Sequence, residues 1–343
     1  MTSAAAEPIA ESITKLFGAG MPPGGNWLSH LLKKKLDDLP LPGAGETLQR
    51  WRALAAVGEF DLSLTKLYEG HTDALAILNE IGQEKSGIAP GAWCVWAAEA
   101  PGARALIHRD GSASVRLSGA KYWCSGASTC EHALLTAWAD DGSGPYLVAM
   151  ELNQPGITVD ATQWKAVGMA GSMSVNVAFD GAKGRCVGTP GQYLTRPGFW
   201  HGGAGLAACW YGGAVGIASV LRASLLSNIK DSAGSKQASL GKVELALAQT
   251  AAALRQAATW IDLHPGFDAS YLALVTRLSA EKCAKVVIDE VGKAMGATPF
   301  CLNEKFARAA ADLPVFIRQS HAERDFAALG ERSLSAPATA WTL

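Results

Sequence analysis

The stretch Lys121-Tyr-Trp-Cys-Ser-Gly-Ala127 lies in a block of the chain whose pattern differs from that on either side. This block runs from about Gly91 to Gly191 and consists of short segments separated by turn signals such as Pro155-Gly156. Two of the segments, Ser114-Val-Arg-Leu117 and Tyr146-Leu-Val-Ala-Met150, are rich in residues that favour strands. We therefore expect an antiparallel β domain here.

Both flanking blocks have the periodicity of helices. Before Gly87, apolar residues such as Leu67, Ala74 and Leu78 recur at helical spacing. After Pro197, four long stretches have the length and pattern of bundle helices: 203–228, 237–263, 270–295 and 303–329. The sequence thus predicts an α+β protein with an N-terminal helical domain (1–89), a middle antiparallel β barrel (90–192) and a C-terminal four-helix bundle (193–343).

The composition argues against several classes of protein. The 343 residues are 49% hydrophobic and 18% charged, which is too apolar for a disordered chain. The 30 Lys and Arg residues balance 31 Asp and Glu residues, so we expect no nucleic-acid partner. The seven cysteines form no Cys-x-x-Cys pair, which argues against a disulfide framework and a metal site. We expect a reducing, cytoplasmic location.

One segment, Gly202–Leu221, carries no charged residue and is about as long as a membrane span. It contains six glycines, which allow helices to approach closely, so we expect a buried helix of the bundle and no membrane association. The N-terminal residues Met1–Ser12 include Glu7 and Glu11 and do not resemble an export signal.

Four motifs of the middle block occur in a recognisable order and spacing. They are Lys121–Ala127, Pro155-Gly-Ile157, Gly168-Met-Ala-Gly-Ser-Met-Ser174 and Val177-Ala-Phe-Asp180. Together they resemble the β domain of the acyl-CoA dehydrogenase superfamily of flavoproteins. The resemblance implies the same three-part fold, FAD as cofactor, and a homodimer or homotetramer.

The resemblance also implies which residues contact the cofactor. Trp123, followed by Cys124 and Ser125, would pack near the isoalloxazine ring, with the Ser125 hydroxyl close to flavin N5. An aromatic wall excludes water, and a hydroxyl can stabilise charge that develops on the reduced ring. Ala98 and Glu99 lie where the family contacts the flavin pyrimidine, although this chain lacks the family's threonine.

Two further segments correspond to the family's contacts with the rest of FAD. The family's Arg-x-x-Phe-Gly is similar to Lys230-Asp-Ser-Ala233-Gly234, where Lys230 keeps the charge but loses the bidentate fork. The family's Gln-x-x-Gly-Gly is similar to Lys293-Ala-Met-Gly296-Ala297, where only Gly296 is retained.

The catalytic carboxylate of the family has no counterpart. Its two usual positions fall near Ser320 and Leu206, neither of which can abstract a proton. His321, Glu323 and His201 are the candidates to replace it, since burial can tune either residue type to act as a base. The simpler alternative is that His321 and Asp325, with Arg318, form a solvated, ion-paired helix face.

These observations leave three functions open. The leading one is an FAD-dependent oxidoreductase that acts on an acyl-CoA or a related small acyl substrate, with an electron acceptor that the sequence does not identify. A flavin-dependent monooxygenase on the same fold is the second. A catalytically silent ligand-binding homologue is the third.

Overall fold

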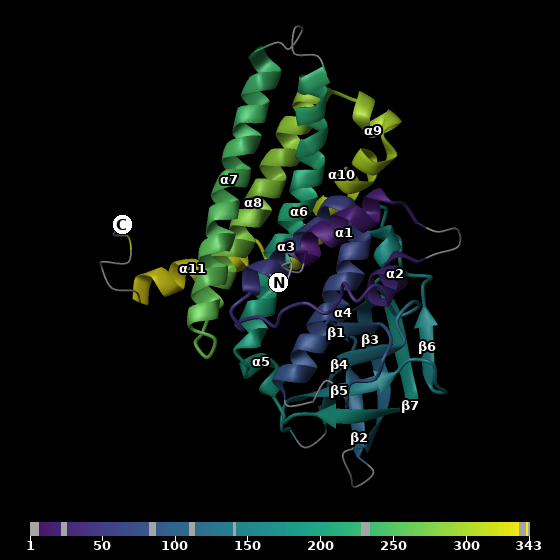
Figure 1. Ribbon diagram of the computed structural model, residues 1–343. Coiled ribbons are helices and arrows are strands. Elements are labelled where there is room, and N and C mark those ends of the chain that lie inside the picture. Colours follow the sequence, from purple (N-terminus) through teal and green to yellow (C-terminus); the bar gives the residue numbers. More distant parts are fainter. Residues whose placement is uncertain are drawn as a thin grey trace, which may run out of the picture. The chain divides into compact units, whose positions relative to one another are not determined.

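The computed structural model describes residues 7–21, 26–81, 87–109, 114–139, 142–227, 234–335 and 341. They form two compact units, which we call the helical unit (1–14, 40–62 and 200–343) and the barrel unit (15–39 and 63–199). Figure 1 labels the elements. The helices are α1 Ile9–Gly18, α2 Trp27–Lys33, α3 Thr47–Phe60, α4 Leu62–Glu80, α5 Gln192–Thr195, α6 Gly198–Ser227, α7 Gly234–Leu263, α8 Ser270–Met295, α9 Thr298–Leu302, α10 Glu304–Phe316 and α11 Glu323–Ser335. The strands are β1 Trp93–Trp96, β2 Ala105–Arg109, β3 Ser114–Cys124, β4 His132–Ala139, β5 Pro145–Glu151, β6 Ile157–Asp160 and β7 Val175–Val187.

The strands of the barrel unit close on themselves. They follow the order β1-β4-β2-β3-β7-β5, and β5 also pairs with β4, which closes the ring β4-β2-β3-β7-β5 and leaves β1 paired to β4 alone. The short strand β6 pairs with β7. The predicted α+β class with a β barrel is therefore confirmed.

The expectation of a purely antiparallel barrel is wrong in one respect. Strands β1 and β2 both run parallel to β4, so the sheet is mixed. Turn signals report only on strands that are neighbours in the chain, whereas Trp93 pairs with His132 across a connection that contains β2 and β3. No local pattern in the sequence could have revealed that direction.

The core of the barrel unit lies between helix α4 and the sheet. Ile77 and Leu78 of α4 pack with Trp93, Leu134 and Leu147 in one buried cluster. The α4 residues in this cluster recur at helical spacing and so share one face of the helix, and the strand residues come from the face of the sheet that is turned towards α4. This packing holds the strands on which the candidate site is built.

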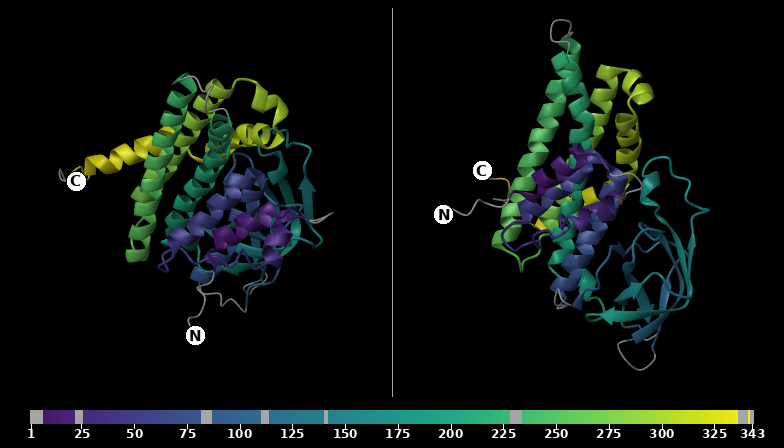
Figure 2. Two further views of the ribbon diagram at one scale, coloured as in Figure 1. Left: turned by 45° about the horizontal axis from the view of Figure 1, so that its top comes forward. Right: turned by 45° about the vertical axis from the view of Figure 1, so that its right-hand side comes forward.

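In the helical unit, α6, α7 and α8 run side by side (Figure 2). Helix α6 also approaches α3 very closely. A Cβ atom added at Gly212 would lie 2.1 Å from the Ala55 carbonyl oxygen, and one at Gly216 would lie 2.8 Å from that of Glu59. These glycines are thus explained by helix packing. Helix α6 has the length and apolarity of a membrane span, but 67% of its most apolar window is buried inside the protein, as in a core helix.

The fourth predicted bundle helix, 303–329, is not continuous. Helix α10 contains Pro314 and passes into a 3-10 turn at Ile317–Gln319, and α11 begins only at Glu323. Ala322 between them has a φ of 44°, which a helix cannot accommodate. The expectation that Arg318, His321 and Asp325 share one helix face is therefore wrong.

Candidate functional site

A bulge in strand β3 brings Trp123 to the surface of the barrel unit. The β3–β7 ladder pairs Lys121 with Val177 and then Cys124 with Val175, so that Tyr122 and Trp123 together oppose a single residue of β7. The Trp123 backbone has a φ of 60°, and 57% of the residue is exposed. Bulges of this kind redirect side chains beside functional sites.

A row of three serine hydroxyls lies next to this bulge. The Ser125 Oγ is 2.7 Å from the Ser174 Oγ, which is 2.9 Å from the Ser172 Oγ. The Ser172 hydroxyl donates to the Met169 carbonyl oxygen at 2.8 Å. Met169 and Met173 both have positive φ angles, so the segment that carries Ser172 and Ser174 is sharply turned.

The surroundings hold Ser125 in place. The Trp96 Nε1–H donates to the Ser125 carbonyl oxygen at 2.9 Å, and the Gly126 amide donates to the Ser172 carbonyl oxygen at 3.2 Å. Cys124 is fully buried, and burial raises the pKa of its thiol to about 12. Cys124 is therefore a protonated structural residue between Trp123 and Ser125.

The Glu99 carboxylate is hydrogen-bonded to other residues of the barrel unit. Its Oε1 accepts from the Lys121 Nζ at 2.9 Å and from the Thr136 hydroxyl at 2.5 Å, and its Oε2 accepts from the Trp138 indole at 3.1 Å. Partial burial raises the pKa of Glu99, but these hydrogen bonds and the Lys121 charge outweigh it and lower that pKa overall. Ala98 is exposed just beyond β1. The carboxylate of Glu99 thus anchors Lys121, which is 2% exposed.

In the helical unit, Ser320 adjoins a carboxylate that sequence reasoning missed. Glu281 of α8 is 2% exposed, and its Oε1 accepts from the Lys285 Nζ at 2.6 Å and lies 3.5 Å from the Arg318 Nη2. Its burial raises the pKa, but the Lys285 hydrogen bond, the nearby Ser320 hydroxyl and the Lys285 and Arg318 charges outweigh that and lower the pKa. No motif marks Glu281, because it lies far from Ser320 in the chain.

His321 lies in the break before α11 rather than on a helix. Its side chain is 56% exposed, and its Nδ1 lies 3.5 Å from the Asp325 Oδ1. The His321 amide donates to the Asp325 Oδ2 at 3.1 Å, so Asp325 stabilises the turn. Glu323 is exposed in the first turn of α11, where a negative charge favours the helix dipole.

Two other predicted residues fall in different surroundings. His201 is 2% exposed and lies against Gly43, so it is enclosed within the helical unit. Lys230 lies outside the described residues.

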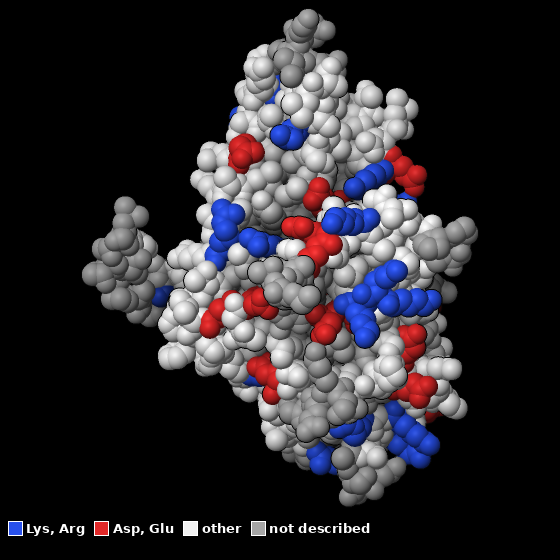
Figure 3. Space-filling view, viewed as in Figure 1, with Lys and Arg blue, Asp and Glu red and all other residues white. Residues whose placement is uncertain are grey.

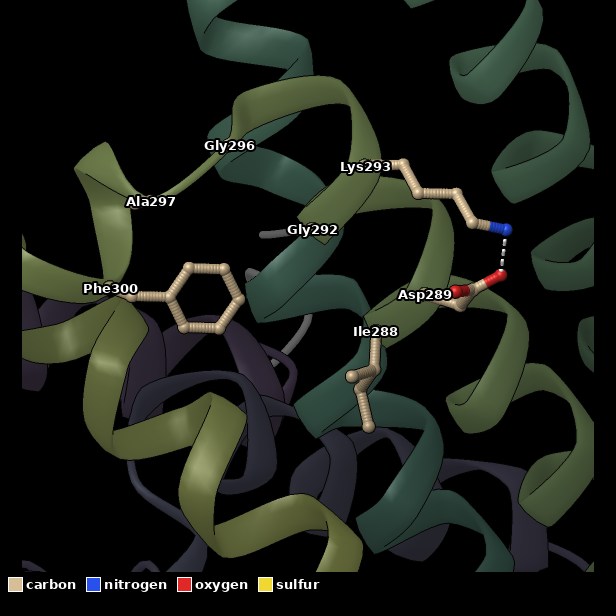
Figure 4. A pocket seen from close by; sticks show the side chains of 7 residues that line it. All are labelled: Ile288, Asp289, Gly292, Lys293, Gly296, Ala297 and Phe300. Carbon is tan, nitrogen blue, oxygen red and sulfur yellow. Dashed lines mark hydrogen bonds and ion pairs between the residues drawn. The ribbon is translucent and has the colours of Figure 1, made fainter.

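Gly296 borders a shallow hollow of about 500 Å³ on the helical unit (Figure 4). Gly296 ends α8 with a φ of 64°, and a Cβ atom there would meet nothing within 4 Å. The Phe300 ring lies on one side of the hollow, and the Lys293–Asp289 ion pair lies on the other. The positive φ at the end of α8 thus favours glycine at position 296, and the missing side chain leaves open space beside the hollow.

The barrel-unit residues fit the ring portion of a flavin. The exposed Trp123 offers a flat aromatic surface, and Ser125, two residues further along the chain, offers a hydroxyl that could bond a ring edge. Within the described residues, no group of His, Cys, Asp and Glu has the composition of a metal site.

Comparison with known proteins supports the fold. No protein-family model and no curated protein matches the chain in sequence. Among solved structures, KijD3 in complex with FMN and a dTDP-linked amino sugar has a TM-score of 0.78 and 18% identity, covering 97% of this chain and 95% of that one. TdsC from Paenibacillus sp. A11-2, in complex with FMN and indole, has a TM-score of 0.74 and 18% identity over 95% and 96% of the two chains. The 3-HSA hydroxylase from Rhodococcus sp. RHA1 has a TM-score of 0.71 and 16% identity over 96% and 93%.

The chain therefore has the acyl-CoA dehydrogenase-like fold that the sequence motifs predicted. It is a divergent example, since identity to these neighbours is at most 18%.

Proposed function

We propose that the protein is a flavin-dependent oxidoreductase. The observation that carries the proposal is the β3 bulge, which exposes Trp123 in the motif, with Ser125, to which the resemblance assigns contact with the flavin ring. The names of the neighbours support it, because KijD3 and TdsC were each solved with FMN.

The chain's own residues supply the binding surface. The Trp123 indole covers one side of a planar ligand and excludes water from it, while Ser125 orients one edge by a hydrogen bond. A bound flavin would supply the electron transfer that no side chain here can perform.

Oxygen-dependent chemistry is our first candidate for the reaction. The two positions that carry the catalytic carboxylate in acyl-CoA dehydrogenases hold Ser320 and Leu206, and neither side chain is itself a base that could remove a weakly acidic α-proton. A monooxygenase needs no such carboxylate. The names of similar folds agree, since they include a dibenzothiophene monooxygenase and a hydroxylase.

Oxidation of an acyl thioester is the second candidate, and Glu281 is the observation that favours it. This buried carboxylate lies near Ser320, so a carboxylate is close to the expected position of the base.

The resemblance makes FAD our proposed form of the flavin. We also propose a homodimer or homotetramer that acts in the cytoplasm on a small molecule. On the face shown in Figure 3, acidic and basic side chains are interspersed, which suits a small-molecule substrate better than a polyanion.

The test begins with the purified protein. We expect a yellow protein, or an apoprotein that binds FAD in titration. Reduction of the bound flavin is then followed without oxygen in the presence of a series of acyl-CoAs, and oxygen consumption is measured separately with chemically reduced flavin. Failure to bind FAD or FMN would contradict the proposal, and fast anaerobic reduction by an acyl-CoA would select the second candidate.

A further inference from the structure

The three serines beside Trp123 have a fixed order of donors and acceptors. Ser172 donates its only hydroxyl proton to the Met169 carbonyl oxygen, which can only accept. The Ser172 Oγ must therefore accept from Ser174 at 2.9 Å. Since Ser174 has used its proton, its Oγ must accept from Ser125 at 2.7 Å. The proton of Ser125 thus points along the row.

This order decides what Ser125 offers to a ligand. With its proton committed to Ser174, the Ser125 Oγ presents only lone pairs. Ser172 is 1% exposed, so water cannot easily replace its bond to Met169 and reverse the row. Ser125 is 8% exposed and follows two residues after Trp123, which is 57% exposed.

We propose that Ser172 and Ser174 are positioning residues that hold the Ser125 hydroxyl as a hydrogen-bond acceptor. A site with a fixed acceptor prefers a ligand edge that carries an N–H or O–H group, and it rejects an edge that carries only a lone pair. For a flavin, N5 is a lone-pair acceptor in the oxidised ring and an N–H donor in the dihydro ring. The inference rests on the proposed function and adds that the site selects the reduced form.

The test measures dissociation constants of oxidised FAD and of dithionite-reduced FAD, both without oxygen, and repeats the pair with FMN. For the wild-type protein we expect the reduced form to bind more tightly. In Ser172→Ala, Ser174 can turn its proton towards Ser125, which frees the Ser125 proton for a ligand. In Ser174→Ala, the Ser125 proton is freed directly. Both variants should bind oxidised flavin more tightly and lower the preference for the reduced form roughly 3- to 10-fold, the effect of one hydrogen bond.

Three controls separate this role from a general loss of structure. Ser174→Thr keeps a hydroxyl and should retain the wild-type preference. Ser125→Ala removes the acceptor and should weaken the binding of reduced flavin without improving that of oxidised flavin. Ser118→Ala, on the same strand but bonded to His108, should change neither constant.

The outcomes are distinguishable. An unchanged preference in both Ser172→Ala and Ser174→Ala, or an equal loss of both flavin forms, would overturn the assignment of the serine row while leaving flavin binding intact. A wild-type protein that binds neither form would overturn the proposed function and, with it, the ligand assigned here. Hydroxyl-proton exchange of isotope-labelled serine in the ligand-free protein tests the row by itself, and rapid exchange at Ser172 would contradict the fixed order.

Discussion

At the scale of single residues, backbone geometry places the side chains that matter. Trp123 is a large apolar residue, yet 57% of it is exposed because a bulge and a φ of 60° turn it outwards. A β-branched or bulky residue in this conformation carries a cost of about 1–3 kcal/mol, which the surrounding fold must offset. Trp96, by contrast, is 2% exposed and packs inside the protein, as most large apolar side chains do.

Replacing Trp123 by Ala tests the indole as a wall of the site. We expect the affinity for flavin to fall about 2- to 10-fold, because a contact between aromatic groups contributes about 0.5–1.5 kcal/mol beyond the area that it buries. Titration of the apoprotein with FAD, followed by fluorescence, measures the change. Trp341→Ala removes another exposed indole, 89% exposed, and should have no effect. Full flavin retention by Trp123→Ala would exclude this residue as the ring wall.

Glu281 predicts a pH dependence of folding stability. Its folded-state pKa lies below the usual value, so its ionised form stabilises the fold above the unfolded-state pKa, and this contribution is lost as pH falls through the folded-state pKa. Glu281→Gln should lower the free energy of unfolding at pH about 7 by about 1–3 kcal/mol and flatten the decline towards pH about 4. Urea unfolding at both pH values measures it. Glu304→Gln, at an 86% exposed side chain, should change little, and equal effects of both substitutions would argue against a special role for Glu281.

At the scale of elements, the glycines of α6 resolve an ambiguity in its composition. The same uncharged segment suits a lipid bilayer or a tightly packed core, and the close approach to α3 decides for packing within the protein. The break before α11 is a second feature at the scale of elements. His321 was predicted on a helix face, but it lies in a turn that Asp325 stabilises.

Gly212→Ala and Gly241→Ala form a matched pair that tests the α3–α6 packing. The added methyl at Gly212 would lie 2.1 Å from a backbone carbonyl, so the helices must separate, and we expect a loss of more than about 2 kcal/mol of unfolding free energy. At Gly241 on α7 nothing lies within 4 Å, and alanine should stabilise the helix by roughly 0.5–1 kcal/mol. Denaturant unfolding gives both values, and a harmless Gly212→Ala would show that the two helices can move apart.

At the scale of the whole molecule, the open question is the class of reaction. The fold is shared with proteins whose identity to this chain is at most 18%, so it cannot by itself assign a substrate. What separates acyl oxidation from oxygen chemistry is a single proton-accepting group at the position of Ser320.

Ser320→Glu, with Ser320→Gln as its uncharged control, tests that group. If the segment between α10 and α11 follows the family register, the new carboxylate should raise the anaerobic rate of flavin reduction by an acyl-CoA, by up to the ~10²–10⁴-fold typical of a general base. The neighbouring Glu281 raises the pKa of a second carboxylate, so the gain should increase with pH. Rapid reduction by the wild-type protein, abolished by Glu281→Gln, would show instead that Glu281 already serves as the base.

The amino-acid sequence by itself determined the order of the helical and β blocks along the chain, because side-chain periodicity shows which face of each element is buried. The motifs around Trp123 and Ser174 also revealed the fold before any coordinates. Only the tertiary structure decided that β1 and β2 run parallel to β4, that α11 is separate, and that the buried Glu281 lies near Ser320. Each of these depends on residues far apart in the chain, and a local pattern carries no record of a distant partner. The serine row depends on the sequence and on the tertiary structure. Ser172 and Ser174 belong to a motif that the sequence shows, but the tertiary structure brings Ser125 within hydrogen-bond distance of Ser174.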